Sequence, residues 1–142
     1  MIVLDASCLV SLLRGEPGQN DVVGAMAGQC VMNVLNRAEV IDRLARYGAV
    51  ADDVAADLDT LGIAFEPLTV ELADQAATLR SRHYHRAERP LSLADCVALA
   101  TAMATGSSLA TSDVHLAVTC AGLGRHVVEV ANSIGHYPLP KS

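Results

Sequence analysis

The chain has 142 residues, a formal net charge of −6, 51% hydrophobic residues and 18% charged residues. This length predicts a single domain spanning residues 1–142, which is large enough to bury roughly 70% of the surface of its unfolded chain. The apolar composition argues against a disordered chain. The negative charge argues against a general nucleic-acid-binding surface, unless basic patches or metal ions compensate for it locally.

The amino terminus and the cysteines indicate a cytoplasmic protein that does not enter a membrane. The chain opens MIVLDASCLV, without a basic start or a cleavage-site pattern, so no signal peptide is expected. No uninterrupted apolar run approaches the ~18 residues of a membrane span. The cysteines stand far apart, without CxxC or His-Cys ligand spacing, and are expected to be reduced and buried: Cys8, Cys30, Cys96 and Cys120.

In the first half of the chain, short aliphatic runs alternate with segments of helical periodicity. We expect strands at residues 2–4, 30–32 and 63–65, and helices at residues 6–13, 19–27, 36–47 and 51–61. Asn36 and Glu39 have the spacing of a capping box, in which a polar side chain and an acid three residues later bond each other's backbone N–H groups. Gly48 is expected to end that helix.

The second half repeats this alternation and predicts the fold class. Helices are expected at residues 69–83, 93–105 and 114–123, strands at 108–111 and 126–130, and a surface segment at 132–142. Strands that alternate with helices, joined by connections long enough for crossovers, predict an α/β fold. Its expected form is a three-layer α/β/α sandwich with a mostly parallel central sheet.

Four acidic residues are expected at one edge of this sheet. Asp5 directly follows the first strand and Asp113 follows the strand at 108–111, so parallel strands place both carboxylates at the same edge. Ligands of open α/β sheets bind outside the carboxyl ends of the strands. Glu39 and Asp95 each lie three residues after a proposed helix cap, and four carboxylates converge if those two helix starts face the same edge.

Helix capping explains each of these acids more simply when it is taken alone. Capping does not account for Asp5, however, or for the stretch 90–124, in which Asp95 and Asp113 are the only charged side chains and have no basic partner. An ionised carboxylate in apolar surroundings needs a partner. The convergence therefore favours a cation site, and oxygen ligands favour Mg²⁺, or Mn²⁺ in its place, over zinc.

The acidic motifs resemble those of PIN-domain nucleases and, within them, the small VapC-type toxins of bacterial type II toxin–antitoxin systems. The matching pieces are MIVLDAS at 1–7, NRAEV at 36–40, LSLAD at 91–95 and LATSD at 109–113. Each piece is a weak signal alone, but the four in this order and spacing cover nearly the whole chain. The sequence departs from many relatives at Cys96 and Val114, which follow the last two aspartates where a basic residue is common, and this bears on substrate positioning.

The resemblance implies a PIN-like fold and a magnesium-dependent endoribonuclease. Its catalytic residues and metal ligands would be an acidic quartet of Asp5, Glu39, Asp95 and Asp113. Ser7 and Ser112 would be polar helpers, and a metal-activated water would cleave RNA to leave 5′-phosphate and 3′-hydroxyl ends. The resemblance also implies a homodimer and a VapB-type antitoxin that inserts a segment into the active-site groove, with DNA contacted only indirectly through that antitoxin.

A basic segment at residues 80–89 holds four of the ten lysines and arginines. Arginine pairs with phosphate and tyrosine stacks on unpaired bases, so this segment is a candidate for RNA binding through Arg80, Arg82, Arg86 and Tyr84. An exposed helix end, where basic residues complement the helix dipole, explains the same segment equally well. Both interpretations stay open.

Two other classes of protein also place acids at the strand ends of a parallel sheet. A receiver-like phosphoacceptor domain normally needs a lysine after a late strand, whereas the only lysine here is Lys141. A haloacid-dehalogenase-type phosphatase needs an aspartate two residues after Asp5, where Ser7 stands. A catalytically silent PIN-like module that only binds a partner is a further alternative.

Overall fold

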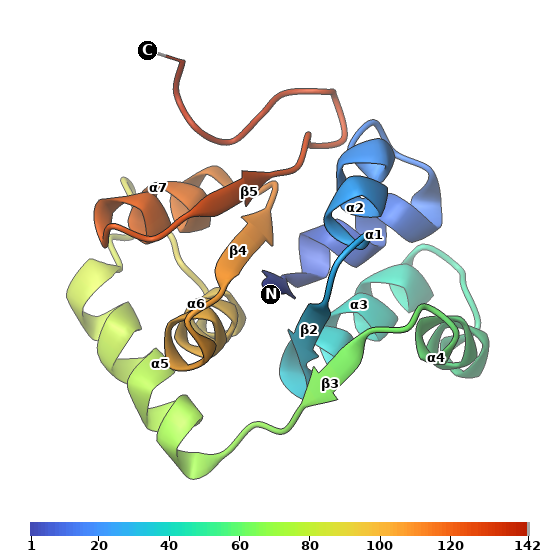
Figure 1. Cartoon of the computed structure of the whole chain (residues 1–142), viewed down its shortest axis with the longest axis horizontal. Helices are drawn as coiled ribbons and strands as arrows, with labels where there is room; N and C mark the ends of the chain where they lie inside the picture. Colours follow the sequence, from blue (N-terminus) through green and yellow to red (C-terminus); the bar gives the residue numbers. More distant parts are fainter. Residues whose placement is uncertain (142) are drawn as a thin grey trace.

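The computed structural model describes residues 1–141, so Ser142, the last residue of the predicted surface segment, lies outside the described residues. Residues 1–141 form five strands and seven helices (Figure 1). In chain order these are β1 (Ile2–Leu4), α1 (Ala6–Arg14), α2 (Gln19–Ala25), β2 (Cys30–Asn33), α3 (Val34–Arg46), α4 (Ala51–Asp59), β3 (Ala64–Glu66), α5 (Val70–His83), α6 (Leu93–Thr105), β4 (Ser108–Thr111), α7 (Val114–Gly122) and β5 (Val127–Glu129).

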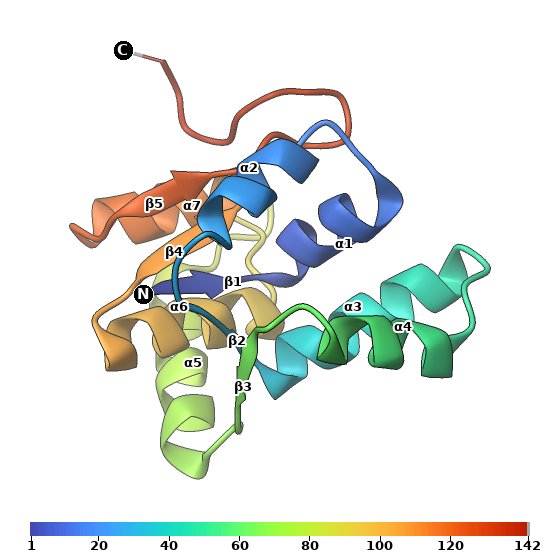
Figure 2. The same ribbon diagram turned by 45° about the vertical axis from the view of Figure 1, so that its right-hand side comes forward.

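The strands form one parallel sheet in the order β3-β2-β1-β4-β5. The chain first winds outward from β1 to β3 and then crosses back to add β4 and β5 on the other side, so the strand order reverses between β1 and β4 (Figure 2). A receiver-like domain has the order 2-1-3-4-5, and this topology therefore excludes that alternative. A crevice for ligands is expected where β1 and β4 end.

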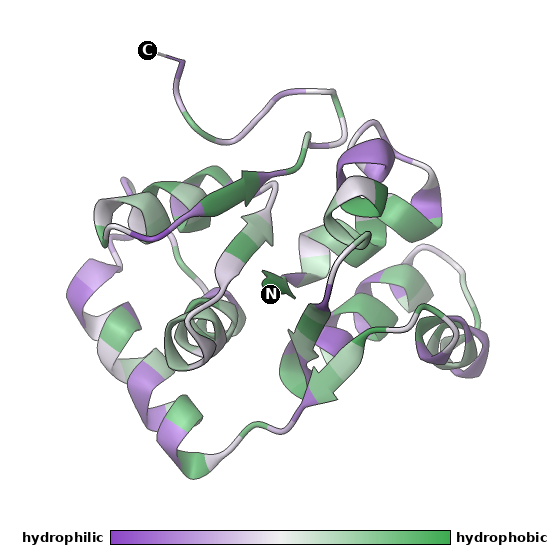
Figure 3. Cartoon of the chain, in the orientation of Figure 1, coloured by the Kyte–Doolittle hydropathy of each residue, from purple (hydrophilic) through white to green (hydrophobic). Residues whose placement is uncertain are grey.

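Helices cover both faces of the sheet, because successive side chains of each strand point to opposite faces. Val3 and Leu109 are buried against α5, α6 and α7, whereas their neighbours Leu4 and Ala110 are buried against α1 to α4. Hydrophobic residues accordingly dominate the strands, and hydrophilic residues gather on α4 and α5 (Figure 3). The predicted three-layer α/β/α architecture is confirmed.

The start of α3 differs from the prediction. Asn33, the last residue of β2, caps this helix by accepting a hydrogen bond from the Leu35 N–H at 3.0 Å. The strand thus runs straight into the helix, and α3 begins at Val34 rather than after Asn36. The predicted capping box of Asn36 and Glu39 is wrong. Asn36 lies buried inside the helix and Glu39 lies more than a turn from its start.

Smaller differences concern the last part of the chain and the strand ends. β3 begins one residue later than predicted, and β5 is shorter than the predicted strand at 126–130. The segment after residue 131 is fastened to the domain, because the Tyr137 hydroxyl donates to Asp21 Oδ1 at 3.1 Å and Pro138 is buried.

All four cysteines are free and buried, as predicted. Over residues 1–141, no helix combines the length and the apolar character needed to span a membrane.

Candidate active site

Asp5 and Asp113 stand where β1 and β4 end, and each begins the helix that follows. Asp5 Oδ1 accepts the Cys8 N–H at 3.2 Å as the cap of α1, and Asp113 Oδ1 accepts the Leu116 N–H at 2.8 Å as the cap of α7. The expectation that capping does not explain Asp5 is therefore wrong. Because β1 and β4 are parallel neighbours, the two carboxylates share one edge of the sheet, at the reversal of strand order.

Glu39 and Asp95 reach the same edge from α3 and α6. Asp95 forms the predicted capping box with Ser92, accepting the Ser92 N–H at 2.9 Å while its own N–H donates to Ser92 Oγ at 3.0 Å. The Asn36 side chain donates from Nδ2 to the Ala94 carbonyl at 3.0 Å, and this bond holds α3 against the first turn of α6. A buried amide, rather than a second capping box, thus places Glu39 beside Asp95.

A cavity of about 200 Å³ lies at this edge, and we call it the acidic cavity. Its lining consists of Asp5, Ala6, Ser7, Glu39, Arg43, Ser92, Asp95 and Asp113. The structure therefore brings together the four acids singled out from the sequence, together with Ser7. Ser112 does not line the cavity; its backbone N–H donates to Ser7 Oγ at 3.1 Å. The catalytic roles of these residues remain predictions.

Thr111, which the sequence interpretation missed, joins two of the acids. This residue is fully buried at the end of β4. Its hydroxyl donates to Asp5 Oδ2 and accepts the Asp113 N–H at 2.9 Å, while Ser7 Oγ donates to Asp5 Oδ1 at 2.5 Å. The sequence signal that could have indicated Thr111 is a hydroxyl residue at the end of an apolar strand, two positions before an aspartate. Thr111 and Ser7 thus fix the orientation of the Asp5 carboxylate.

Burial raises the pKa values of three acids of the cavity, and the charges of neighbouring acids add to the rise for Asp95 and Glu39. Burial, the largest cause, raises the pKa of Asp95 to about 6, and the negative charges of Asp113 and Asp5 add to it against the opposing hydrogen bond from Ser92. Burial and the charges of Asp95 and Asp5 also raise the pKa of Glu39, while the nearby Arg43 lowers it. The pKa of Asp5 is raised by burial although its hydroxyl partners oppose this. A bound cation would offset both the cost of burying these ionised carboxylates and the repulsion between them.

The donor chemistry of the acidic cavity fits a hard divalent cation, because its ligand atoms are carboxylate oxygens. Among residues 1–141, however, no group of three or more His, Cys, Asp or Glu side chains is arranged to hold a metal ion as it stands. Asp5, Asp95 and Asp113 each direct one carboxylate oxygen at a backbone N–H. Mg²⁺ usually takes one or two carboxylates and keeps several waters, so an incomplete protein ligand set suits it.

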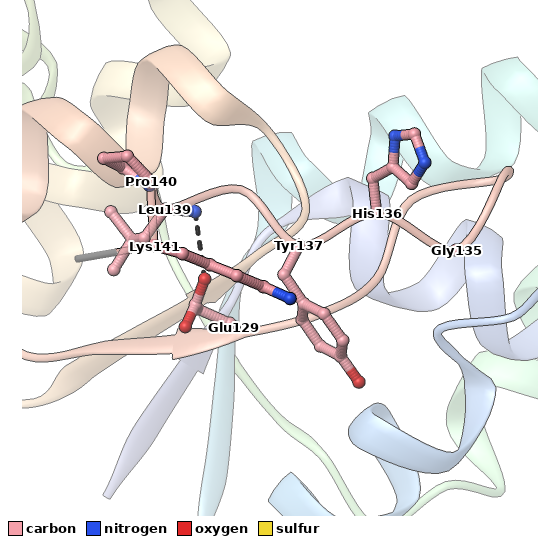
Figure 4. Close-up of a pocket in the computed structure, with 7 residues that line it drawn as sticks. All are labelled: Glu129, Gly135, His136, Tyr137, Leu139, Pro140 and Lys141. Carbon is pink, nitrogen blue, oxygen red and sulfur yellow. Dashed lines mark hydrogen bonds between the residues drawn. The ribbon is translucent and has the colours of Figure 1, made fainter.

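A second, larger cavity of about 640 Å³ lies between β5 and the last residues of the chain (Figure 4). Its lining consists of Glu129, Gly135, His136, Tyr137, Leu139, Pro140 and Lys141. It holds a single carboxylate, and Glu129 Oε1 already accepts the Leu139 N–H at 2.9 Å (Figure 4). None of the acids at the carboxyl ends of β1 and β4 reaches it, so we place the candidate active site in the acidic cavity despite its smaller volume.

The predicted RNA-binding segment does not reach the acidic cavity. Arg80 Nε donates to the Leu91 carbonyl at 2.9 Å, and its guanidinium stacks 4.2 Å from the centre of the Tyr84 ring. Arg82 and Arg86 are exposed, and none of the four predicted residues lines the cavity. The one basic residue in the lining is Arg43. RNA binding by the segment at 80–89 therefore remains a prediction without a contact to the candidate site.

Solved structures of three proteins share this fold at low sequence identity. The toxin–antitoxin complex from Klebsiella pneumoniae is 19% identical with a TM-score of 0.65, over 87% of this chain and 92% of that chain. VapC20 from Mycobacterium tuberculosis, described as a sarcin–ricin loop cleaving toxin, is 22% identical with a TM-score of 0.65, over 77% and 87%. FitAcB from Neisseria gonorrhoeae is 20% identical with a TM-score of 0.62, over 89% and 96%.

Comparisons of the sequence itself give one match. A search of curated protein sequences finds none. The family model described as the PIN domain matches residues 2–121, a range that includes β1, β4, the start of α6 and all four acids of the cavity. The match extends over far more than half of the chain, and the solved structures share its architecture. The chain therefore belongs to the PIN domain family.

Proposed function

We propose that this protein is an endoribonuclease that depends on Mg²⁺, or on Mn²⁺ in its place, and that it acts as the toxin of a toxin–antitoxin pair. The observation that carries the proposal is the meeting of four carboxylates, two from α3 and α6 and two from the caps of α1 and α7, around one cavity at the reversal of strand order. Membership of the PIN domain family and the likeness to toxin–antitoxin structures support it further. RNA as the substrate is in keeping with the activity described for VapC20.

The proposed mechanism divides the work among the residues of the cavity. Asp5 and Asp95 would be the principal ligands, Glu39 would hold the same ion or its water, and Asp113 would complete the set directly or through water. When bound, the ion supplies an activated water and neutralises charge on the phosphate. No protein nucleophile is required, and Ser7 Oγ, which donates to Asp5 Oδ1 and accepts the Ser112 N–H, orients the Asp5 carboxylate. The hydrolysis is expected to leave 5′-phosphate and 3′-hydroxyl ends.

Partner proteins belong to the proposal as well. A VapB-type antitoxin is expected to cover the acidic cavity, and a homodimer is expected for the toxin itself. A positively charged side chain of such a partner would meet four carboxylates, two of which have pKa values raised by their neighbours' charges. Contact with DNA would come only through the antitoxin.

A catalytically silent binding module is the second candidate, and one observation favours it. Asp5, Asp95 and Asp113 all have a structural role as helix caps, which would preserve them without any chemistry. Glu39 argues against this alternative, because it caps no helix and yet lies partly buried among acids that raise its pKa. Such a residue costs stability and is better explained by a ligand.

The proposal predicts cleavage of RNA by the purified protein in the presence of Mg²⁺ or Mn²⁺. Total RNA is incubated with each ion, with Ca²⁺ and with EDTA, and the 5′ ends of the fragments are mapped by sequencing. Fragments with 5′-phosphates are expected with Mg²⁺ or Mn²⁺, and none with EDTA. Cleavage that persists in EDTA would refute the metal-dependent mechanism. A protein that cuts no RNA but binds a basic partner tightly would support the silent module.

The raised pKa of Asp95 predicts that ion binding strengthens with pH. The carboxyl group of Asp95 holds its proton more tightly in the folded protein than in the unfolded chain. Protonation of Asp95 therefore adds fully to the free energy of unfolding at pH below about 4, and this contribution is lost as the pH rises through about 6. Mn²⁺ binds the ionised carboxylates, so the rise in melting temperature on adding Mn²⁺ should be larger at pH 7 than at pH 5. Thermal unfolding at both pH values measures this, and in the Asp95→Asn variant the pH-dependent part should shrink. An equal Mn²⁺ effect at both pH values would contradict the prediction.

A further inference from the structure

Arg43 links the acidic cavity to a neighbouring surface. It lines that cavity together with Glu39. It also lines a separate hollow of about 170 Å³, whose other lining residues are Arg46 and Tyr47. On a helix, residues spaced by four and by seven or eight lie along one face. Glu39, Arg43, Arg46 and Tyr47 follow this spacing along α3 and its carboxyl end, so a basic and aromatic strip runs about 12 Å along the helix from the acids.

Tyr47 is an exposed aromatic ring held in place by an arginine. Its exposed fraction is 66%, although a tyrosine ring gains stability by being covered. α1 packs beside α3 (Figures 1 and 2), and Arg14 at the end of α1 stacks its guanidinium 3.6 Å from the centre of the Tyr47 ring. Arg14 and Tyr47 also line another hollow, of about 350 Å³, whereas Arg14 does not line the hollow of Arg43 and Arg46. Tyr47 therefore lines two hollows, one shared with Arg14 and the other shared with Arg43 and Arg46.

Arg46 and Arg14 have only weak ion-pair partners. Arg46 pairs with Asp42 at 3.1 Å within one exposed helix face, and Arg14 lies 3.6 Å from Glu16. Exposed ion pairs of this kind contribute little, so a phosphate can displace them at small cost. Asp57 also lines the hollow next to Arg14, whereas the hollow of Arg43, Arg46 and Tyr47 contains no carboxylate.

We propose that Arg43, Arg46 and Tyr47, with Arg14 behind the ring, bind single-stranded RNA beside the bond to be cleaved, and we call these four residues the α3 strip. An unpaired base stacks on Tyr47 in the hollow that it shares with Arg43 and Arg46, and these two arginines contact the backbone phosphates that lead to the acidic cavity. The inference rests on the proposed ribonuclease function and adds the surface that grips the substrate. It also replaces the segment at 80–89 as the main RNA contact.

The segment at 80–89 offers a matched comparison, because it contains a similar pair of residues. Arg80 stacks on Tyr84 much as Arg14 stacks on Tyr47, and Tyr84 is 39% exposed. Arg80 is additionally tied to the Leu91 carbonyl, and neither residue lines the acidic cavity. Arg14 and Tyr47 do not line that cavity either, but Tyr47 shares a hollow with Arg43, which does.

The test measures the binding of a series of short single-stranded RNA oligonucleotides of the same mixed sequence. Each oligonucleotide carries 2-aminopurine at a different internal position. Binding is followed in EDTA, so that the RNA is not cleaved, by fluorescence anisotropy of an end label and by quenching of 2-aminopurine. Tyr47→Leu should weaken binding about 5- to 150-fold and abolish the quenching, because one base stack is lost. Tyr47→Phe keeps the ring and should bind as the wild type does.

Arg46→Gln tests the phosphate contact separately, through the salt dependence of the same binding. Removal of one contact to single-stranded RNA should reduce the slope of log K against log salt by about 0.7. Tyr84→Leu and Arg82→Gln are the controls and should change affinity less than twofold. All of these side chains are partly or largely exposed, and thermal unfolding verifies that each variant is folded.

The outcomes separate this inference from the proposed function. If the wild type cuts RNA but Tyr47→Leu binds it unchanged, or if Tyr84→Leu loses as much affinity, the α3 strip is not the binding surface and the ribonuclease proposal stands. If the wild type neither binds nor cuts RNA, both proposals fail together. Lost affinity without lost quenching in Tyr47→Leu would show that the ring does not stack on a base, which also overturns the inference.

Discussion

Asp95→Asn is expected to lower metal-dependent RNA cleavage on the order of 10³-fold or more, since it removes a proposed ligand whose charge is needed only when the ion and the phosphate are present. The fold should survive. Asparagine can still accept the Ser92 N–H, and burial with the charges of Asp113 and Asp5 penalises the ionised aspartate that it replaces. Without divalent ions at pH 7, the variant should be about 1–2 kcal/mol more stable than the wild type, allowing for solvent screening at this partly exposed site.

Cleavage rates and urea unfolding, measured on the same preparations, test both parts of this prediction. Asp53→Asn is the control, because Asp53 is an exposed acid in the first turn of α4 and does not line the acidic cavity. It should change neither cleavage nor stability appreciably. Equal cleavage by Asp95→Asn and wild type would refute the acidic-quartet mechanism. A variant that loses both activity and stability would indicate that Asp95 acts mainly as a helix cap.

Thr111→Val is expected to destabilise the protein by about 2–3 kcal/mol, because it removes a hydroxyl that bonds a buried carboxylate and leaves that carboxylate short of a donor. Valine has nearly the same shape, so the effect comes from the lost bonds to Asp5 Oδ2 and to the Asp113 N–H rather than from a cavity. Cleavage should fall as well, since Asp5 and Asp113 lose the group that joins them.

Chemical denaturation at pH 7 gives the stability change, and Thr111→Ser should restore most of it because serine keeps the hydroxyl. Thr101→Val is the matched control. Thr101 is equally buried, but its hydroxyl donates to the Val97 carbonyl of its own helix, away from any acid. Its loss should cost less than half as much. If Thr101→Val and Thr111→Val lose the same stability, the bond to Asp5 has no special weight.

The positions of Asp5 and Asp113 could be read from the sequence with little ambiguity. Each follows a short apolar strand and begins a helix, and local periodicity with the preference for parallel strands in alternating α/β chains places both at one edge. The capping box of Ser92 and Asp95 was equally local, because its two partners are three residues apart. The helices and strands, their layers and the positions of these three acids can thus be predicted from short-range patterns, without knowing which residues meet in space.

The convergence of Glu39 with the other acids was decided by tertiary structure. The sequence placed Glu39 in a capping box that does not form, and its true position depends on the bond from Asn36 to the Ala94 carbonyl, across 58 residues of chain. Thr111 and Arg43 likewise acquired their neighbours only by folding, the first beneath Asp5 and the second between two cavities. Hydrogen bonds and shared cavities between distant segments leave no periodic trace in a single sequence. The sequence by itself therefore determined which residues end the strands and begin the helices, and the packing of α3 against α6 and α1 decided which side chains meet.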